Sequence, residues 1–124
     1  MINPNVTLEH LNNTSKGTML EHLAIEYTEL GEDYICGKMP VDHRTVQPLQ
    51  MLHGGASVVL AESLGSIAAN ACLDHTKQYA VGLDINANHI RGVKSESGFV
   101  YGKATAVHLG ATTQIWQIDI TNEA

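Results

Sequence analysis

Residues 53–73 read HGGASVVLAESLGSIAANACL, and from Ala56 to Leu73 this stretch contains no proline. Alanine, serine and leucine dominate it, which favours a helix of this length. Small side chains recur along the stretch and would let the helix lie close against a sheet. We therefore predict one long helix over Ala56–Leu73 at the centre of the fold.

The segments on either side of this helix alternate apolar and polar residues, as half-buried strands do. The expected strands are Ala24–Leu30, Tyr34–Met39, Tyr79–Ile90, Gly98–His108 and Thr112–Thr121. In the last strand the core candidates are Ile115, Ile118 or Trp116, and Ile120. A short helix is expected over Thr7–Asn12 with Thr7 as its N-cap, and another helical turn over Thr18–Leu23. The order predicts an α+β domain over residues 1–124, with an antiparallel sheet packed on one helix.

Composition excludes several classes of protein. The chain has 124 residues and a net charge of −6, so it can form one domain with its own core but lacks the basic surface that nucleic acid requires. Cys36 and Cys72 lie far apart, which predicts free thiols and a cytoplasmic location. The N-terminus does not resemble a signal peptide, and Ala56–Leu73 is too polar to span a membrane.

Glu62 is the only charged side chain between Ala56 and Leu73. It faces either a cleft or a narrow exposed stripe of the helix, and in a cleft it would suit work as a base or nucleophile. Ser66 lies one helical turn further on the same face, where it could position water or substrate or simply pack against the sheet.

His53, Gly54 and Gly55 open the helix, where backbone N–H groups and the helix dipole favour developing negative charge. Glycine there allows close approach of a ligand, although a simple glycine turn is the alternative. Gln47, in the preceding loop, could bond a reacting carbonyl or merely be solvated. His53 and Glu62 are nine residues apart, roughly 13 Å along a helix, so one carbonyl cannot easily touch both. If both act, the site is shared between two subunits.

A short basic stretch, His89, Arg91 and Lys94 with Gly92, would suit a phosphate or a solvated strand end. His108, Leu109 and Gly110 are expected to form a turn that could face a ligand. The sequence contains no paired ligand spacing for a metal, no Walker A loop and no GxSxG elbow. We therefore expect neither a metal site nor a bound cofactor.

Several segments resemble the hot-dog thioesterases, most closely the branch that contains 1,4-dihydroxy-2-naphthoyl-CoA hydrolase and the enterobactin proofreading thioesterase. These segments are MPVDHRTVQP (39–48), LHGGASVVLAESLGS (52–66), VGLDINANHIR (81–91), HLG (108–110) and QIWQI (114–118). The resemblance implies a hot-dog fold and hydrolysis of an aromatic or bulky acyl-CoA. It also implies a homodimer with shared sites, assembled into a homotetramer, and a last strand that would follow Ala124.

The resemblance also implies a role for each matching residue. Glu62 is the expected catalytic carboxylate, Gly55 the backbone donor to the thioester carbonyl, Gln47 and His53 its polar neighbours, and Ser66 a hydroxyl one turn beyond Glu62. The expected coenzyme A contacts are Gly82, His89, Ile90, Arg91, Gly92, His108, Leu109, Gly110 and Ala111.

Two other functions remain open. One is a hot-dog hydratase or dehydratase acting on 3-hydroxyacyl thioesters, although HGG fits that pattern poorly. The other is a non-catalytic acyl-CoA-binding module. A purely structural dimer is disfavoured by the isolated Glu62.

Overall fold

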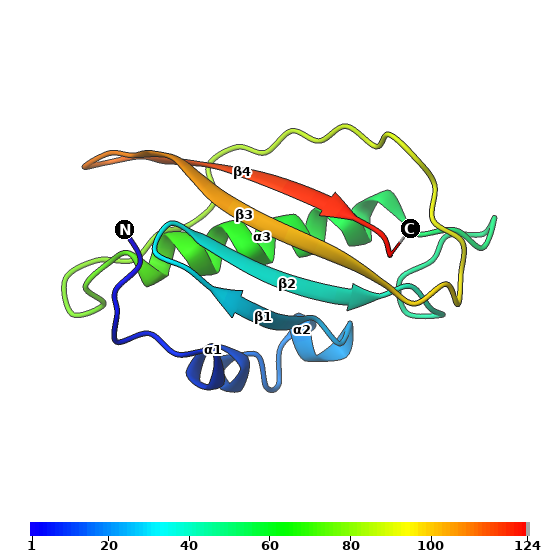
Figure 1. The fold of residues 1–124 in the computed structure, drawn as a ribbon, viewed down its shortest axis with the longest axis horizontal. Coiled ribbons are helices and arrows are strands. Elements are labelled where there is room, and N and C mark those ends of the chain that lie inside the picture. Colours follow the sequence, from blue (N-terminus) through cyan, green and yellow to red (C-terminus); the bar gives the residue numbers. More distant parts are fainter. Residues whose placement is uncertain (124) are drawn as a thin grey trace.

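The computed structural model describes residues 1–123, so Ala124, the last residue of the predicted domain, lies outside the described residues. Figure 1 shows a sheet packed on one long helix, with two short helices at the N-terminal side. The elements in chain order are α1 (Leu8–Thr14), α2 (Met19–His22), β1 (Glu26–Leu30), β2 (Tyr34–Pro40), α3 (Gly54–Ala71), β3 (Phe99–Leu109) and β4 (Gln114–Thr121).

The four strands form one antiparallel sheet in the order β1-β2-β3-β4. Helix α3 packs across one face of this sheet and contacts β2, β3 and β4. The expected α+β architecture is therefore confirmed. The N-cap Thr7 is also confirmed, because its side-chain oxygen accepts the His10 N–H in the first turn of α1. Thr18 caps α2 in the same way, with its side-chain oxygen accepting the Leu20 N–H.

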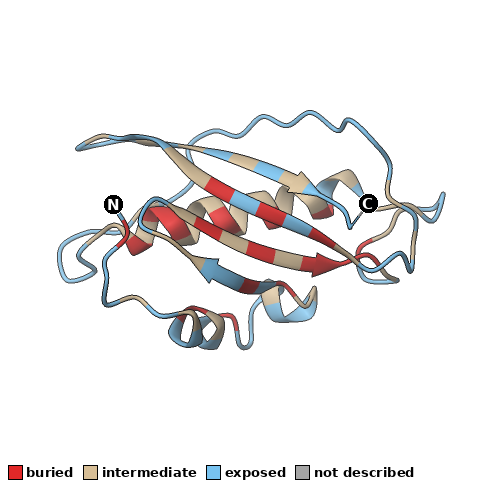
Figure 2. Ribbon diagram, viewed as in Figure 1, coloured by how far each residue is buried: buried red, intermediate tan, exposed pale blue. Residues whose placement is uncertain are grey.

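Helix α3 begins at Gly54, two residues earlier than expected, because the His53 side chain caps it. The His53 Nδ1 accepts the Gly55 N–H at 2.8 Å and so satisfies one of the free donors of the first turn. Leu60, Leu64 and Ala68 follow one another at four-residue spacing, and each is fully buried against the sheet. Figure 2 shows this buried stripe of α3 facing buried positions of β2 and β3.

A pair of glycines lets the helix approach the sheet closely. Gly37 on β2 and Gly102 on β3 stand directly opposite each other in the ladder. A Cβ on Gly37 would lie 3.0 Å from one Leu64 methyl carbon, and a Cβ on Gly102 would lie 2.5 Å from the other. The Leu64 side chain therefore occupies the space that two absent side chains leave.

The strand expected over Tyr79–Ile90 is wrong. Residues 81–92 make no backbone hydrogen bond within the described chain, and a strand requires a partner ladder. The segment instead runs in an extended form from the end of α3 back toward its start (Figure 1). In β4 the residues that pack on the core are Trp116, Ile118 and Ile120, whereas the core candidate Ile115 is 56% exposed on the other face.

Candidate active site

Glu62 lies half-buried near the middle of α3. Its carboxylate rests against the backbone of Gly82, since a Cβ built there would lie 3.3 Å from Glu62 Oε2. Among residues 1–123, no ion pair includes this carboxylate. Glu62 therefore faces the extended segment after α3, and no cation among the described residues pairs with its carboxylate.

The start of α3 is held by the exposed imidazole of His53. Its Nδ1 accepts the Gly55 N–H, and a Cβ on Gly55 would lie only 2.9 Å from that nitrogen. Glycine at position 55 is therefore needed for the ring to fold back over the first turn. The Gly55 N–H, which is expected to polarise a carbonyl, already donates to His53 Nδ1. A ligand oxygen must therefore share this N–H with the imidazole ring or displace the ring.

Gln47 lies in the loop that leads to the helix. Its N–H donates to the Met51 carbonyl at 2.8 Å, and its side-chain oxygen accepts the Leu49 N–H. These bonds close a tight turn, and the adjoining bridge between Val46 and Leu52 ties the turn to the residue before His53. The structure thus places Gln47 on the approach to the helix start, as the sequence predicted.

The extended segment contacts α3 at three successive levels. Asn70 bonds both backbone groups of Ala80, at 3.0 and 2.8 Å. Gly82 then lies beside Glu62, and the His89 ring lies beside Gly54, where a Cβ would be 3.2 Å from its Nε2. The segment therefore runs antiparallel to the helix and delivers a histidine to its N-terminus.

A cavity of about 320 Å³ opens at this end of the molecule. It is lined by Leu52, Gly54, Ser57, His89, Ile90, Arg91, Gly92 and Val93. The first set of expected coenzyme A contacts, His89 to Gly92, is thus brought together with the helix N-terminus. Imidazole, guanidinium and backbone N–H groups together form a suitable surface for a phosphate.

The second set of expected coenzyme A contacts is not brought together with the first. His108 and Leu109 end β3, and Gly110 donates to the Thr113 carbonyl at 2.9 Å in the turn toward β4, just before Ala111. Figure 1 shows this hairpin tip at the opposite end of the molecule from the loop that follows Ile90. The two sets of expected contacts therefore lie at opposite ends of the described chain.

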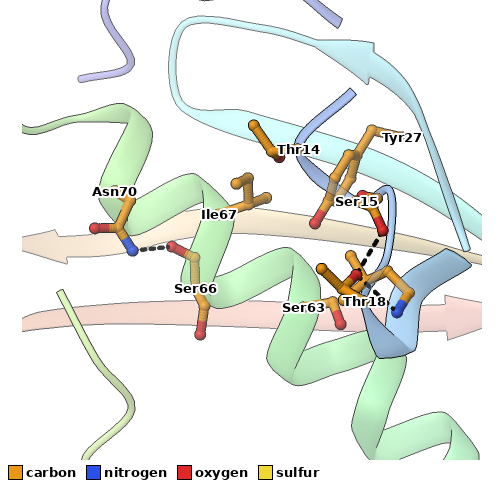
Figure 3. Close-up of a pocket in the computed structure, with 9 residues that line it drawn as sticks. Thr14, Ser15, Thr18, Tyr27, Ser63, Ser66, Ile67 and Asn70 are labelled. Atoms are coloured by element: carbon orange, nitrogen blue, oxygen red, sulfur yellow. Dashed lines mark hydrogen bonds between the residues drawn. The ribbon is translucent and has the colours of Figure 1, made fainter. Parts of the chain in front are cut away.

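A second cavity, of about 240 Å³, lies between α3 and the α1–α2 turn (Figure 3). On α3 its wall consists of Ser63, Ser66, Ile67 and Asn70. Ser66 thus lies between Glu62, one turn earlier, and this cavity. Ser15 and Tyr27 line the opposite side. A serine in a turn and a tyrosine in a strand carry no local sequence signal of a shared cavity.

Residues 1–123 contain neither a group of metal ligands nor a helix that could span a membrane. Across residues 1–123, histidine, cysteine, aspartate and glutamate nowhere form a group of three able to hold a metal ion. Within the same residues, every helix is too short or too polar to cross a bilayer.

The family of this chain follows from its similarity to known proteins. The thioesterase superfamily profile matches residues 49–124. This range includes α3 with Glu62, the extended segment and the β3–β4 hairpin. The chain belongs to the thioesterase superfamily. It is therefore a thioester hydrolase with the hot-dog fold, as its sequence resemblance implied.

Relatives and solved structures support the same family over nearly the whole chain. The 1,4-dihydroxy-2-naphthoyl-CoA hydrolase of Escherichia coli K12 is 48% identical over 95% of this chain and 85% of its own length. The proofreading thioesterase EntH of Cronobacter turicensis is 50% identical over 95% of this chain and 84% of its own. A crystal structure of a mutant thioesterase from Pseudomonas aeruginosa superposes with a TM-score of 0.94 at 44% identity, covering 98% of this chain and 86% of that one.

Proposed function

We propose that this thioesterase hydrolyses acyl-CoA esters with an aromatic or other bulky acyl group, releasing the free acid and coenzyme A. The observation that carries the proposal is Glu62, a half-buried carboxylate without an ion pair in the described chain, placed one turn from a cavity of about 240 Å³. An engineered protein cavity of about 150 Å³ holds benzene, so this one has room for an aromatic ring. The name of the Escherichia coli relative makes 1,4-dihydroxy-2-naphthoyl-CoA the first substrate to try.

In the proposed reaction the thioester carbonyl lies at the start of α3, where backbone N–H groups stabilise the developing oxyanion. Glu62 either attacks the carbonyl carbon or removes a proton from the attacking water. The carbon–sulfur bond then breaks, and the coenzyme A thiolate leaves. Where Glu62 is the nucleophile, this step leaves a mixed anhydride on Glu62, and water hydrolyses it to the free acid and restores the carboxylate. Where water is the nucleophile, the free acid forms directly. Gln47 and His53 support the carbonyl, Ser66 orients the water or the acyl group, and no step requires a metal or cofactor.

Coenzyme A is proposed to lie along the cavity at the helix start, with its phosphates near His89, Arg91 and the backbone of Gly92. Gly82, Ile90 and the turn from His108 to Ala111 complete the proposed contacts. Because that turn lies at the opposite end of the folded molecule from His89 and Arg91, we propose that a second copy of the chain supplies it.

We propose a homodimer with shared sites, paired further into a homotetramer. His53 and Glu62 belong to one helix, roughly 13 Å apart along its axis, so a partner subunit must bring the carboxylate to the carbonyl. The extended segment fits an interface, because Val81, Leu83 and Ile90 are 78%, 89% and 90% exposed. Both cysteines are free in the structure, which fits the proposed cytoplasmic location.

Mixed dimers test whether the site is shared. Subunits carrying Glu62→Gln are co-expressed with differently tagged subunits carrying Gly55→Pro, which lacks the backbone N–H and is tolerated in the first turn of a helix, and the doubly tagged dimer is purified. One of its two sites then retains both native groups, so about half of the wild-type activity per dimer is expected, while each parent homodimer is inactive. An inactive mixed dimer of native stability would place both groups in one subunit.

The test of the activity itself is release of free thiol from a panel of acyl-CoAs. The panel contains benzoyl, 1,4-dihydroxy-2-naphthoyl and medium-chain esters, with crotonyl-CoA included to detect hydration of the double bond. We expect thiol release, fastest with the aromatic esters, and no hydration of crotonyl-CoA. A folded oligomer that binds these esters without releasing thiol would be a binding module, and the proposal would fail.

A further inference from the structure

The side-chain amide of Asn70, in the last turn of α3, makes three hydrogen bonds. Its Nδ2 donates to the Ser66 carbonyl at 2.9 Å (Figure 3) and to the Ala80 carbonyl at 3.0 Å, and its Oδ1 accepts the Ala80 N–H at 2.8 Å. Both donors of the amide are thus used, and the bond to its oxygen fixes the orientation of the group. Asn70 therefore offers Ala80 one donor and one acceptor, as a neighbouring β-strand does.

The segment that begins at Ala80 has no further hydrogen bond along its backbone for a long stretch. Within residues 1–123, the backbone groups of residues 81–92 are not hydrogen-bonded, and the next anchor is Val93, whose carbonyl accepts the Leu52 N–H at 2.7 Å. Val81 is 78% exposed and Leu83 is 89% exposed, so neither side chain packs firmly on the described chain. Asn70 is therefore the hydrogen-bonded anchor for the first half of this segment.

The anchor at Ala80 also determines the position of Gly82. Two extended residues span at most about 7 Å, so a movement of Ala80 away from α3 also moves Gly82. A Cβ built on Gly82 would lie 3.3 Å from Glu62 Oε2 and 3.8 Å from Oε1, so this backbone faces both oxygens of the carboxylate. Asn70 thus acts through Gly82 on Glu62, which lies about two helical turns earlier on α3.

Asn12 makes the same pair of backbone bonds elsewhere in the fold. Its side chain accepts the Tyr27 N–H at 2.9 Å and donates to the Tyr27 carbonyl at 3.0 Å. Tyr27 also belongs to the β1–β2 ladder, where it stands opposite Gly37. Asn12 therefore reinforces a strand that is already paired, whereas Asn70 bonds a segment that has no paired strand within residues 1–123.

We infer that Asn70 is a positioning residue for the reaction, because its amide holds Ala80 on α3 and thereby keeps Gly82 packed against the Glu62 carboxylate. The inference rests on the proposed catalytic role of Glu62. A carboxylate that attacks a carbonyl or accepts a proton must be held in its reactive orientation, and a displacement of about 1 Å costs roughly 10² in rate.

Loss of the Asn70 bonds should lower kcat more than it changes KM. The proposed coenzyme A contacts at residues 89–92 adjoin Val93, which Leu52 holds without help from Asn70. Asn70→Ala and Asn70→Leu both remove the three bonds, and both new residues favour a helix, with leucine also keeping most of the side-chain volume. For each variant we expect kcat to fall by about ten- to a hundredfold, with KM changed by less than about threefold.

The matched control is Asn12→Ala, which removes the same pair of backbone bonds from Tyr27 but leaves the β1–β2 ladder in place. It should lower the midpoint of thermal unfolding by an amount similar to that of Asn70→Ala, because each variant loses two bonds to the backbone of another element. Its kcat should stay within about twofold of wild type. Calorimetric titration with a non-hydrolysable thioether analogue counts the binding sites, and a full count in Asn70→Ala excludes an unfolded fraction as the cause of the lower kcat.

Two measurements report the position of the segment without turnover. Amide hydrogen exchange at residues 80–82 should be faster in Asn70→Ala than in wild type, with exchange in β3 unchanged. The carbon-13 resonance of the Glu62 carboxyl group, assigned with Glu62→Gln, should shift in Asn70→Ala and not in Asn12→Ala. Both changes in a protein that hydrolyses none of the esters would support the role of Asn70 although the proposed function had failed.

Wild-type kcat in both Asn70 variants would overturn the inference and leave the hydrolase activity intact. Equal losses of kcat in Asn70→Ala and Asn12→Ala would also overturn it, because the effect would then follow stability alone. An unchanged Glu62 resonance in Asn70→Ala would overturn it independently of any activity.

Discussion

Replacing Glu62 with glutamine is expected to lower kcat for acyl-CoA hydrolysis by about 10² to 10⁴, the range that a positioned base contributes. Glutamine keeps the length and shape of the side chain and its contact with Gly82, but it can neither attack a carbonyl nor accept a proton from water. Binding of the ester should change little. Steady-state thiol release and isothermal calorimetry with a non-hydrolysable thioether analogue measure the two effects separately.

The matched control for this variant is Glu9→Gln, which removes an exposed carboxylate from another helix, α1. It should retain wild-type kcat, with only a small decrease in the midpoint of thermal unfolding, because Glu9 lies in the first turn of α1. A Glu62→Gln enzyme that keeps more than about a tenth of kcat would show that another group performs the proton transfer or the attack. Hydrolysis in oxygen-18 water distinguishes the two roles of Glu62, since label enters the carboxylate only if it is the nucleophile.

The sequence predicted the centre of the fold because its signals there are local. Glycines after His53 and the proline-free run to Leu73 define α3 by themselves, and alternation defines β1, β2, β3 and β4. Alternation of apolar and polar residues does not show whether a segment has a neighbouring strand to bond with. For this reason the sequence of residues 79–90 predicts a strand that the structure does not contain. The segment has the residue pattern of a strand but makes no ladder in the described chain.

The candidate site was only partly predictable for a similar reason. Glu62 is conspicuous in the sequence, since it is the only charge in a long apolar stretch. The cavity that Ser15, Tyr27 and Ser66 line exists only after folding brings the α1–α2 turn, β1 and α3 together. The engagement of the Gly55 N–H by His53 also depends on a side-chain rotamer that no spacing rule reports.

The largest effect on stability is expected from Leu64, the fully buried leucine above the glycine pair of β2 and β3. Leu64→Ala should lower the free energy of unfolding by about 3–5 kcal/mol, because it removes buried apolar surface and leaves a cavity. Gly102→Ala should also destabilise, by about 1–3 kcal/mol, since its Cβ would lie 2.5 Å from a Leu64 methyl carbon. That carbon cannot retreat easily, because the other Leu64 methyl is already held against Gly37.

The double variant decides whether this contact causes both effects. In a Leu64→Ala background the new methyl of Gly102→Ala meets empty space, so its cost should vanish or reverse, with a coupling free energy of at least about 1 kcal/mol. Urea unfolding at one fixed protein concentration measures all four proteins, because subunit association also contributes to apparent stability. Gly65→Ala is the control: its Cβ would meet Ile118 at an ordinary 3.7 Å, and alanine favours the helix. Strict additivity of Leu64→Ala and Gly102→Ala would mean that the sheet moves to accommodate the methyl, and that the glycine pair does not set the distance between helix and sheet.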